Sequence, residues 1–468
     1  MLSDIKSVHF VGICGTAMAS AAAAMREKGF SVTGSDQNVY PPMSTFLADR
    51  RIEVMSGYAE RNLANKPDLV VIGNAISRGN PEAEVVLEKK LRFCSLPELL
   101  KEFFIRGKRS LVVAGTHGKT TITSLLTWVF EHSGLNPSYL VGGIPNNLGQ
   151  GARFTDSEWF IIEGDEYDTA FFDKRSKFVH YLPEVAIINN LEFDHADIFD
   201  DVAAVQRSFS HFIRIIPRNG LLLANGDDPN LAPLLNPPTA GHCPVKRFGL
   251  GEANAVRAFN LKLASTASEF EIPSFKFHLN LVGELNVRNA LAVVACAKHC
   301  GLSNKQIQSG FDTFKGIKRR MEVRGIAGGV TVVDDFGHHP TAIRETLRAL
   351  RIKYPHQKIW AVFEPRSNTT RRNVFQAELV TAFADADAVV VSQVARLEML
   401  SPDVRLDPER LMRELQAGGK PSAYLPDADS IVNHVIRNVD CDDVVCVFSN
   451  GGFGGIHGKL LEQLSARR

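Results

Sequence analysis

The chain has 468 residues, of which 44% are hydrophobic and 22% are charged. At roughly 100 to 200 residues per domain this length predicts two to four domains, and the composition is typical of a globular protein. Lys and Arg total 53 against 52 Asp and Glu, which gives a net charge of +1. This balance excludes a general electrostatic attraction to nucleic acid or to an anionic membrane. Any phosphate recognition must therefore be local.

Neither export nor membrane insertion is expected. No basic region precedes an apolar segment near the N-terminus, and the longest small-apolar run, residues 17–25, is shorter than the about 18 residues that a spanning helix needs. The seven cysteines lack Cys-x-x-Cys spacing, which fits neither a disulfide framework nor a zinc site. The sequence predicts a cytoplasmic protein with no membrane or nucleic-acid partner.

Strand-like and helix-like segments alternate along the chain. Residues 8–13 precede a helix-like run at 17–28, residues 111–114 precede one at 120–132, and residues 360–364 precede one at 375–383. This alternation is typical of α/β folds with parallel sheets. A long helical stretch at 286–314 precedes a new strand-rich run at 323–333. We therefore predict three domains, at residues 1–108, 109–318 and 319–468.

A glycine-rich turn follows the first predicted strand. Gly12, Cys14, Gly15 and Thr16 form it, and Asp36 follows the second strand. The pattern differs from a dinucleotide fingerprint because Cys14 replaces the second glycine, so it is weak evidence for NAD. Such a turn at a helix N-terminus would still bind the diphosphate of another nucleotide. The alternative is a plain strand-to-helix turn.

The most specific motif lies between a hydrophobic strand and an amphipathic helix. Backbone N–H groups of such a loop cradle phosphates, Lys119 would reach the β and γ oxygens, and the Thr120 hydroxyl would hold Mg²⁺. Val113 occupies the place of the first Walker A glycine, so the motif is incomplete. The alternative is a glycine-rich turn with a surface lysine. The candidate ATP-binding residues are Gly115, Thr116, His117, Gly118, Lys119, Thr120 and Thr121.

Polar residues follow several other strands. Glu163 and His195 end apolar runs in the middle domain, and a carboxylate with an imidazole could complete a Mg²⁺ site there. In the third domain, Arg320 is suited to clamping phosphate or ribose and Asp335 to accepting ribose hydroxyls. His338, in a His-His-Pro turn, and the loops at 363–371 and 448–457 are candidates for substrate contact.

These motifs, in this order, resemble the Mur ligase family over essentially the whole chain. The resemblance implies a Rossmann-like N-terminal domain for a UDP-sugar, a central P-loop ATPase domain and a Rossmann-like C-terminal domain that binds the incoming amine. The phrases that carry it are Gly12-Ile-Cys-Gly-Thr16, Asn38-Val-Tyr-Pro-Pro-Met-Ser44, the run at 166–177, Phe363-Glu-Pro-Arg-Ser-Asn368 and the run at 449–457.

The resemblance also implies an activity with ATP and Mg²⁺ as cofactors. The lactyl carboxylate of UDP-N-acetylmuramate attacks the γ-phosphate, and the amine of the murein tripeptide L-Ala-γ-D-Glu-meso-diaminopimelate attacks the resulting acyl phosphate. The alternative within the family is ligation of free L-alanine. The implied roles are phosphoryl-group stabilisation by Lys119, binding of one Mg²⁺ by Thr120 and Glu163 and of a second by His195, and adenosine binding by Asn289, Arg320 and Asp335. The resemblance also implies a place near the amine for His338, UDP-sugar binding by the 12–16 turn and Asp36, and peptide binding by Arg366, Asn368 and His338.

Two departures from the family pattern stand out. Leu285 occupies a place where related ligases often carry histidine, although Asn289 in the same stretch is present. No lysine lies between His195 and Lys246, so the carbamylated lysine of several family members has no counterpart.

Three rival classes remain open. A nicotinamide oxidoreductase would explain Gly12 and Asp36 but would leave the phosphate-loop motif unused. A mechanical or switch NTPase would not need a UDP-sugar domain. A non-catalytic nucleotide-binding module is the third class.

Overall fold

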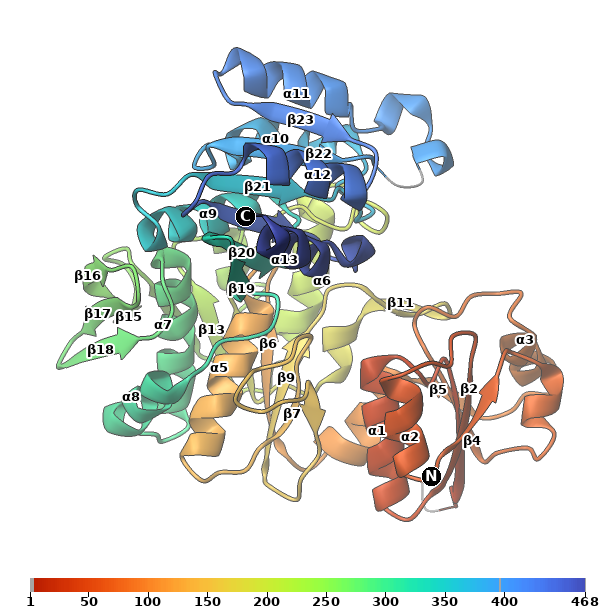
Figure 1. The fold of residues 1–468 in the computed structure, drawn as a ribbon. Coiled ribbons are helices and arrows are strands. Elements are labelled where there is room, and N and C mark those ends of the chain that lie inside the picture. Colours follow the sequence, from red (N-terminus) through yellow and green to blue (C-terminus); the bar gives the residue numbers. More distant parts are fainter. Residues whose placement is uncertain (1–3, 395–396, 468) are drawn as a thin grey trace.

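The computed structural model describes residues 4–394 and 397–467. Its elements form three lobes in chain order: the N-terminal and middle lobes lie side by side, and the C-terminal lobe lies above the middle one in Figure 1. Among the helices in these residues, none combines the length and apolar character needed to cross a membrane.

The N-terminal lobe is a five-stranded parallel sheet in the order β3-β2-β1-β4-β5. Helix α1 follows β1, and its alanines, among them Ala19 and Ala22, are fully buried in the same apolar cluster as the side chains of β1. The bounds are β1 Ser7–Val11, α1 Thr16–Glu27, β2 Ser31–Asp36, α2 Met43–Asp49, β3 Glu53–Ser56, β4 Leu69–Ile72, α3 Pro81–Glu88, β5 Phe93–Ser95 and α4 Leu96–Leu100.

The middle lobe is built on an eight-stranded sheet in the order β15-β14-β13-β12-β6-β9-β7-β8, parallel except for β7 with β8. Helix α5 packs against α7 and α8 on one face of it. The bounds are β6 Arg109–Ala114, α5 Lys119–His132, β7 Ser138–Leu140, β8 Ala152–Arg153, β9 Trp159–Gly164, β12 Val185–Ile188, α6 Val202–Arg214, β13 Leu221–Asn225, β14 Val245–Gly249, β15 Val256–Arg257, α7 Glu284–His299 and α8 Asn304–Thr313.

Two small antiparallel sheets are attached to this lobe. One is the hairpin of β10 (Asp168–Ala170) and β11 (Asp173–Ser176). The other consists of β16 (Phe259–Leu263), β17 (Ser268–Ile272) and β18 (Phe275–Leu279).

The C-terminal lobe is a six-stranded sheet in the order β19-β20-β24-β21-β22-β23, parallel except for β19 with β20. The segment at the end of β20, residues 335–339, lines a cavity together with residues 116–121 of the middle lobe. The bounds are β19 Glu322–Ala327, β20 Val330–Asp335, α9 Pro340–Lys353, β21 Ile359–Phe363, α10 Gln376–Ala382, β22 Ala388–Ser392, α11 Pro408–Ala417, β23 Ser422–Leu425, α12 Ala428–Asn438, β24 Val444–Phe448 and α13 Ile456–Ala466.

The predicted α/β class with mostly parallel sheets is confirmed. The helical stretch expected at 286–314 is two helices, α7 and α8, rather than one. The break follows from local chemistry: Gly301 takes a φ of +92°, and Ser303 with Gln306 forms a capping box that starts α8.

Candidate active site

The loop between β6 and α5 has the conformation that phosphate binding requires. Gly115 and Gly118 take φ values of +133° and +80°, which favour glycine. A Cβ at Gly118 would lie 2.5 Å from Oδ1 of Asn289 on α7. Residues 116–121 line a cavity together with residues of the C-terminal lobe, and an anion in it would be stabilised at the N-terminus of α5.

A segment that follows β12 fixes the shape of this loop. The backbone N–H of His117 donates to Oδ1 of Asn190 at 2.7 Å, and Nδ2 of Asn189 donates to the His117 carbonyl at 3.0 Å. Nδ2 of Asn189 also donates to Oδ1 of Asn289 at 3.1 Å. Asn289 thus lies against the phosphate loop, and two asparagines that the sequence analysis did not single out hold the loop there.

Lys119 is buried at the first turn of α5. Its Nζ donates to the Gly115 carbonyl at 2.6 Å and to Oε2 of Glu166 at 2.8 Å. Burial alone would lower the pKa of Lys119, but the carboxylates of Glu166 and Asp165 outweigh it and the pKa is raised. The side chain is therefore a fixed ammonium group beside the loop, as phosphate binding requires. Glu166 is a partner that the sequence reasoning missed.

The predicted metal ligands are Thr120 and Glu163 for one Mg²⁺ and His195 for a second. Oγ1 of Thr120 donates to Oε1 of Glu163 at 2.9 Å, which is about the spacing of neighbouring ligands around an octahedral ion with bonds near 2.1 Å. Nε2 of His195 lies 3.2 Å from Oε1 of Glu166. The hydroxyl and carboxylate oxygens fit a Mg²⁺ that is shared with nucleotide phosphates, and the imidazole beside Glu166, at the same cavity wall, fits a second ion.

Two pKa shifts show how densely this wall is charged. Burial and the neighbouring Asp165 raise the pKa of Glu163. Burial would also raise the pKa of Glu166, but Lys119 and His195 outweigh it and hold the value at about 2. His195 takes an uncommon positive φ of +57°, and such local strain is characteristic of functional positions.

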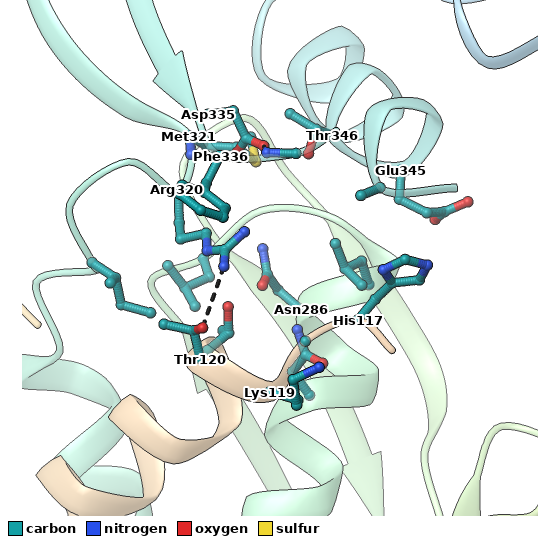
Figure 2. Close-up of a pocket in the computed structure, with 18 of the residues that line it drawn as sticks. His117, Lys119, Thr120, Asn286, Arg320, Met321, Asp335, Phe336, Glu345 and Thr346 are labelled. Atoms are coloured by element: carbon teal, nitrogen blue, oxygen red, sulfur yellow. Dashed lines mark hydrogen bonds between the residues drawn. The ribbon is translucent and has the colours of Figure 1, made fainter. Parts of the chain in front are cut away.

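The C-terminal lobe closes the same cavity from above. Nη2 of Arg320 donates to Oγ1 of Thr120 at 3.3 Å, and Figure 2 shows Arg320 reaching down to the residues of the phosphate loop. Asp335 accepts the backbone N–H groups of Met321 and Gly337 at 2.9 and 2.7 Å. Burial raises the pKa of Asp335. Its oxygens thus fix the turn that presents Arg320, and Asp335 also lines the first cavity.

A further set of contacts joins the lobes beside the phosphate loop. Oε2 of Glu192 accepts a hydrogen bond from Oγ1 of Thr341 at 2.7 Å and lies 3.4 Å from Nε2 of His117. Asp194 accepts from Oγ1 of Thr369 at 2.8 Å and lies 3.8 Å from Nε2 of His338. Glu192 and Asp194 belong to the run that holds His195, but only the fold shows that they contact the third lobe.

Among the described residues, one cavity at this interface borders two others. The first, of about 900 Å³, extends from the phosphate loop past Arg320 toward Lys353. The second, of about 610 Å³, contains Arg366 and Asn368 and shares Tyr167, His195, Phe336 and His338 with the first. The third, of about 250 Å³, runs from Gly15 and Thr16 and shares Gly142, Glu163 and Asp165 with the first.

The remaining predicted site residues lie only in part on the cavity walls. Gly15 and Thr16 line the third cavity, whereas Gly12, Cys14 and Asp36 do not. Oδ2 of Asp36 accepts the backbone N–H of Cys14 at 2.9 Å, so Asp36 shapes the turn whose Gly15 precedes α1. Arg366 and Asn368 line the second cavity, where Arg366 is half-exposed and Nδ2 of Asn368 donates to Oδ2 of Asp197 at 2.7 Å.

The chain matches three family models in order. They are the Mur ligase family catalytic domain at residues 7–108, the Mur ligase middle domain at 113–297 and the Mur ligase glutamate ligase domain at 319–451. A relative from Escherichia coli, UDP-N-acetylmuramate–L-alanyl-γ-D-glutamyl-meso-2,6-diaminoheptandioate ligase, is 43% identical over 98% of this chain and 98% of its own. The chain belongs to the Mur ligase family.

The sequence identity of the chain differs between the branches of this family. A UDP-N-acetylmuramate–L-alanine ligase from Variovorax paradoxus is 32% identical over 100% of this chain and 96% of its own. The crystal structure of a murein peptide ligase from Psychrobacter arcticus is 34% identical, with a TM-score of 0.72 over 98% of this chain and 99% of that one. The predicted family, three-domain architecture and ATP-dependent amide-forming ligase class are confirmed. The sequence identity is higher to the tripeptide-ligating relative from E. coli than to the alanine-ligating one from V. paradoxus.

Proposed function

We propose that this protein joins UDP-N-acetylmuramate to the recycled tripeptide L-Ala-γ-D-Glu-meso-diaminopimelate, converting ATP to ADP and phosphate. The observation that carries the proposal is that the first cavity borders both of the others: it shares Glu163 and Asp165 with the third, and His195 and His338 with the second. A ligase of this kind must bring a nucleotide, a carboxylate donor and an amine acceptor to one point, whereas an NTPase switch needs a single ligand space. The 43% identity to the E. coli relative of that name supports the choice of substrates.

Each cavity then receives one substrate. ATP would occupy the first, with its phosphates on residues 115–121 and its adenosine end near Asn289, Arg320 and Asp335. UDP-N-acetylmuramate would enter through the third, with its diphosphate at the Gly12–Thr16 turn and its lactyl carboxylate directed at the wall of Glu163. The tripeptide would occupy the second, where Arg366, Asn368 and His338 line the space.

The chemistry follows from this placement. A lactyl oxygen attacks the γ-phosphorus, ADP leaves, and the acyl phosphate is formed; the alanyl amine then attacks the carbonyl carbon, and the tetrahedral intermediate expels phosphate. Lys119 stabilises the charge on the transferring phosphoryl group, and Arg320 lies close enough to assist. Thr120 and Glu163 would hold one Mg²⁺ and His195 a second, and these ions neutralise phosphate charge when bound.

Two more features belong to the proposal. We place the domain boundaries near residues 108 and 318, and the gaps between the matched family models, at 108–113 and 297–319, support this placement. We also propose that the protein works in the cytoplasm, where ATP and UDP-sugars are made.

The test is a steady-state assay of phosphate release with UDP-N-acetylmuramate and either the tripeptide or free L-alanine. We expect release to require the muramate nucleotide and the tripeptide together, with little release from L-alanine. Equal or better turnover of L-alanine would reject the tripeptide assignment in favour of the alanine-adding alternative. Phosphate release without either substrate would point to an NTPase.

A further inference from the structure

The hairpin β10–β11 stands apart from the main sheet of the middle lobe and bridges toward the N-terminal lobe (Figure 1). Its tip is anchored there by aromatic packing: the Phe172 ring lies 4.9 Å from that of Phe93 on β5, and Phe171 packs against the same apolar cluster. The hairpin is therefore a fixed element on the wall of the second cavity. The function proposed above assigns no role to it.

Neighbouring side chains on β11 point to opposite faces, as in any strand. Arg175 pairs with Asp173 at 2.7 Å, and Asp173 also lies 3.0 Å from Nε2 of His180, so this face is tied into the protein. Lys174 lines the second cavity instead. It pairs with Asp168 at 2.7 Å across the hairpin, and its side chain is 70% exposed. Such an exposed pair is weak enough to be exchanged for a ligand.

The second cavity carries charges of both signs on walls from different lobes. Lys174 lies on the hairpin and Arg366 on the loop after β21, while Asp168 and Asp197 supply negative charge. Free alanine brings one carboxylate and the reacting amine. The tripeptide brings three carboxylates and a second amine, so it needs cations beyond the reacting end and an anion for the ammonium group. About 610 Å³ is a volume that accommodates a ligand of this size.

We propose that Lys174 binds the α-carboxylate of the D-glutamyl residue and so selects a γ-glutamyl peptide over free alanine; this inference rests on the proposed function. The position follows from the chain. Asp168, which pairs with Lys174, directly follows Tyr167, and the Tyr167 ring lies 4.4 Å from that of His195 at the junction with the ATP cavity. Lys174 thus lines the same cavity as Tyr167 and His195 but not the ATP cavity, so it lies beyond the reacting end, where we place the second residue of the peptide. Arg366 remains for the diaminopimelyl end.

The experiment compares Lys174→Gln with the matched control Arg175→Gln, which removes the same charge from the opposite face of the same strand. We expect Lys174→Gln to raise the tripeptide KM about tenfold or more, with the KM values of ATP and UDP-N-acetylmuramate within about twofold of wild type. Lys174→Arg should keep most of the peptide affinity. Arg175→Gln should leave all three KM values unchanged.

A second acceptor, the tripeptide with its D-glutamyl α-carboxylate amidated, makes the assignment specific. For the wild type, amidation should raise the KM of the peptide about as much as the Lys174→Gln substitution does. In the Lys174→Gln variant, amidation should raise the KM no further. Additive effects of the two changes, an unchanged peptide KM, or a raised UDP-N-acetylmuramate KM would each overturn the proposal. If the wild type does not use the tripeptide at all, the proposed function itself fails, and this outcome is separate from the others.

Discussion

Two clusters of buried carboxylates, one in the N-terminal lobe and one in the middle lobe, are built in opposite ways. Glu82 on α3 is fully buried, and its oxygens accept hydrogen bonds from Oγ of Ser35 and Nδ2 of Asn62, both at 2.6 Å. Nε2 of His9 lies 3.3 Å away. All of these partners belong to the same lobe. The cluster satisfies its own charge and stabilises one fold unit.

The middle cluster distributes its charges along a cavity wall. Lys119, Glu163 and Glu166 come from different elements, and Arg320 reaches the cluster from another lobe. These charges are matched to one another, but they also face a space of about 900 Å³. The comparison teaches that a buried charge indicates a function only where it opens onto such a space. A satisfied cluster without one, such as that of Glu82, serves folding.

The largest effect should come from Lys119→Ala. Loss of a fixed cation at the transferring phosphoryl group should lower ligation about 10² to 10³-fold. The same change leaves the buried Glu166 with only His195 as a counter-charge beside it, so thermal stability should also fall. The double variant Lys119→Ala/Glu166→Gln separates the two effects: calorimetry should show stability regained, while turnover stays low. Recovery of turnover in the double variant would show that Lys119 acts only as a structural partner.

Glu82→Ala should lower stability and leave turnover nearly unchanged. The buried hydroxyl of Ser35 would lose its acceptor, which costs about 1 to 3 kcal/mol of unfolding free energy, whereas Asn62 would keep its bond to the Gly57 carbonyl. Urea unfolding should show this loss, while ligation per folded molecule should stay within about twofold of wild type. A large loss of turnover in fully folded protein would mean that the N-terminal cluster also serves the reaction.

The metal donors should show a smaller and more selective effect. Glu163→Gln and His195→Ala should each raise the Mg²⁺ concentration needed for half-maximal turnover, because each removes a ligand that water replaces poorly. Titration of Mg²⁺ at saturating substrates measures this. Glu82→Gln, as a control, should keep the wild-type Mg²⁺ requirement. An unchanged requirement in both site variants would place the metal elsewhere.

The smallest effect concerns the pH dependence of stability. Burial would raise the pKa of Glu82, but the hydrogen bonds from His9, Ser35 and Asn62 outweigh it and the folded-state pKa is lowered. A lowered folded pKa contributes stability above the unfolded value of about 4.3, and that stability is lost as the pH falls through the folded pKa. The difference in unfolding free energy between wild type and Glu82→Gln should therefore be full at neutral pH and shrink below about pH 4. A difference in unfolding free energy that does not change with pH would contradict this prediction.

The sequence predicted those parts of the site that depend on contiguous residues. The phosphate loop was recognisable because strand, glycines, lysine and helix follow one another, and Glu163 and Asp335 because each ends an apolar strand. Glu166, Glu192 and Asp194 could not be assigned, because their partners Lys119, Thr341 and Thr369 lie far away in the sequence. Tertiary proximity alone gives these side chains their roles.

The fold also divides into features that local sequence predicts and features that depend on distant residues. Alternation of strands and helices predicted the parallel sheets, since the pattern is local. The order of strands in each sheet and the separate β10–β11 hairpin were not predictable from that alternation, because they depend on which edges pair after collapse. The split of the helical stretch at Gly301 was a local signal that the sequence analysis did not use.

The most direct test of the account follows the oxygen atoms of the donor. If the charged wall serves phosphoryl transfer to a carboxylate, one lactyl oxygen becomes the bridge of the acyl phosphate and leaves with phosphate when the amine attacks. UDP-N-acetylmuramate labelled with a heavy oxygen isotope in its lactyl carboxylate, incubated with ATP, Mg²⁺ and the tripeptide, should therefore give phosphate that carries one labelled oxygen, as measured by mass spectrometry. Unlabelled phosphate, released together with the ligated product, would contradict the account.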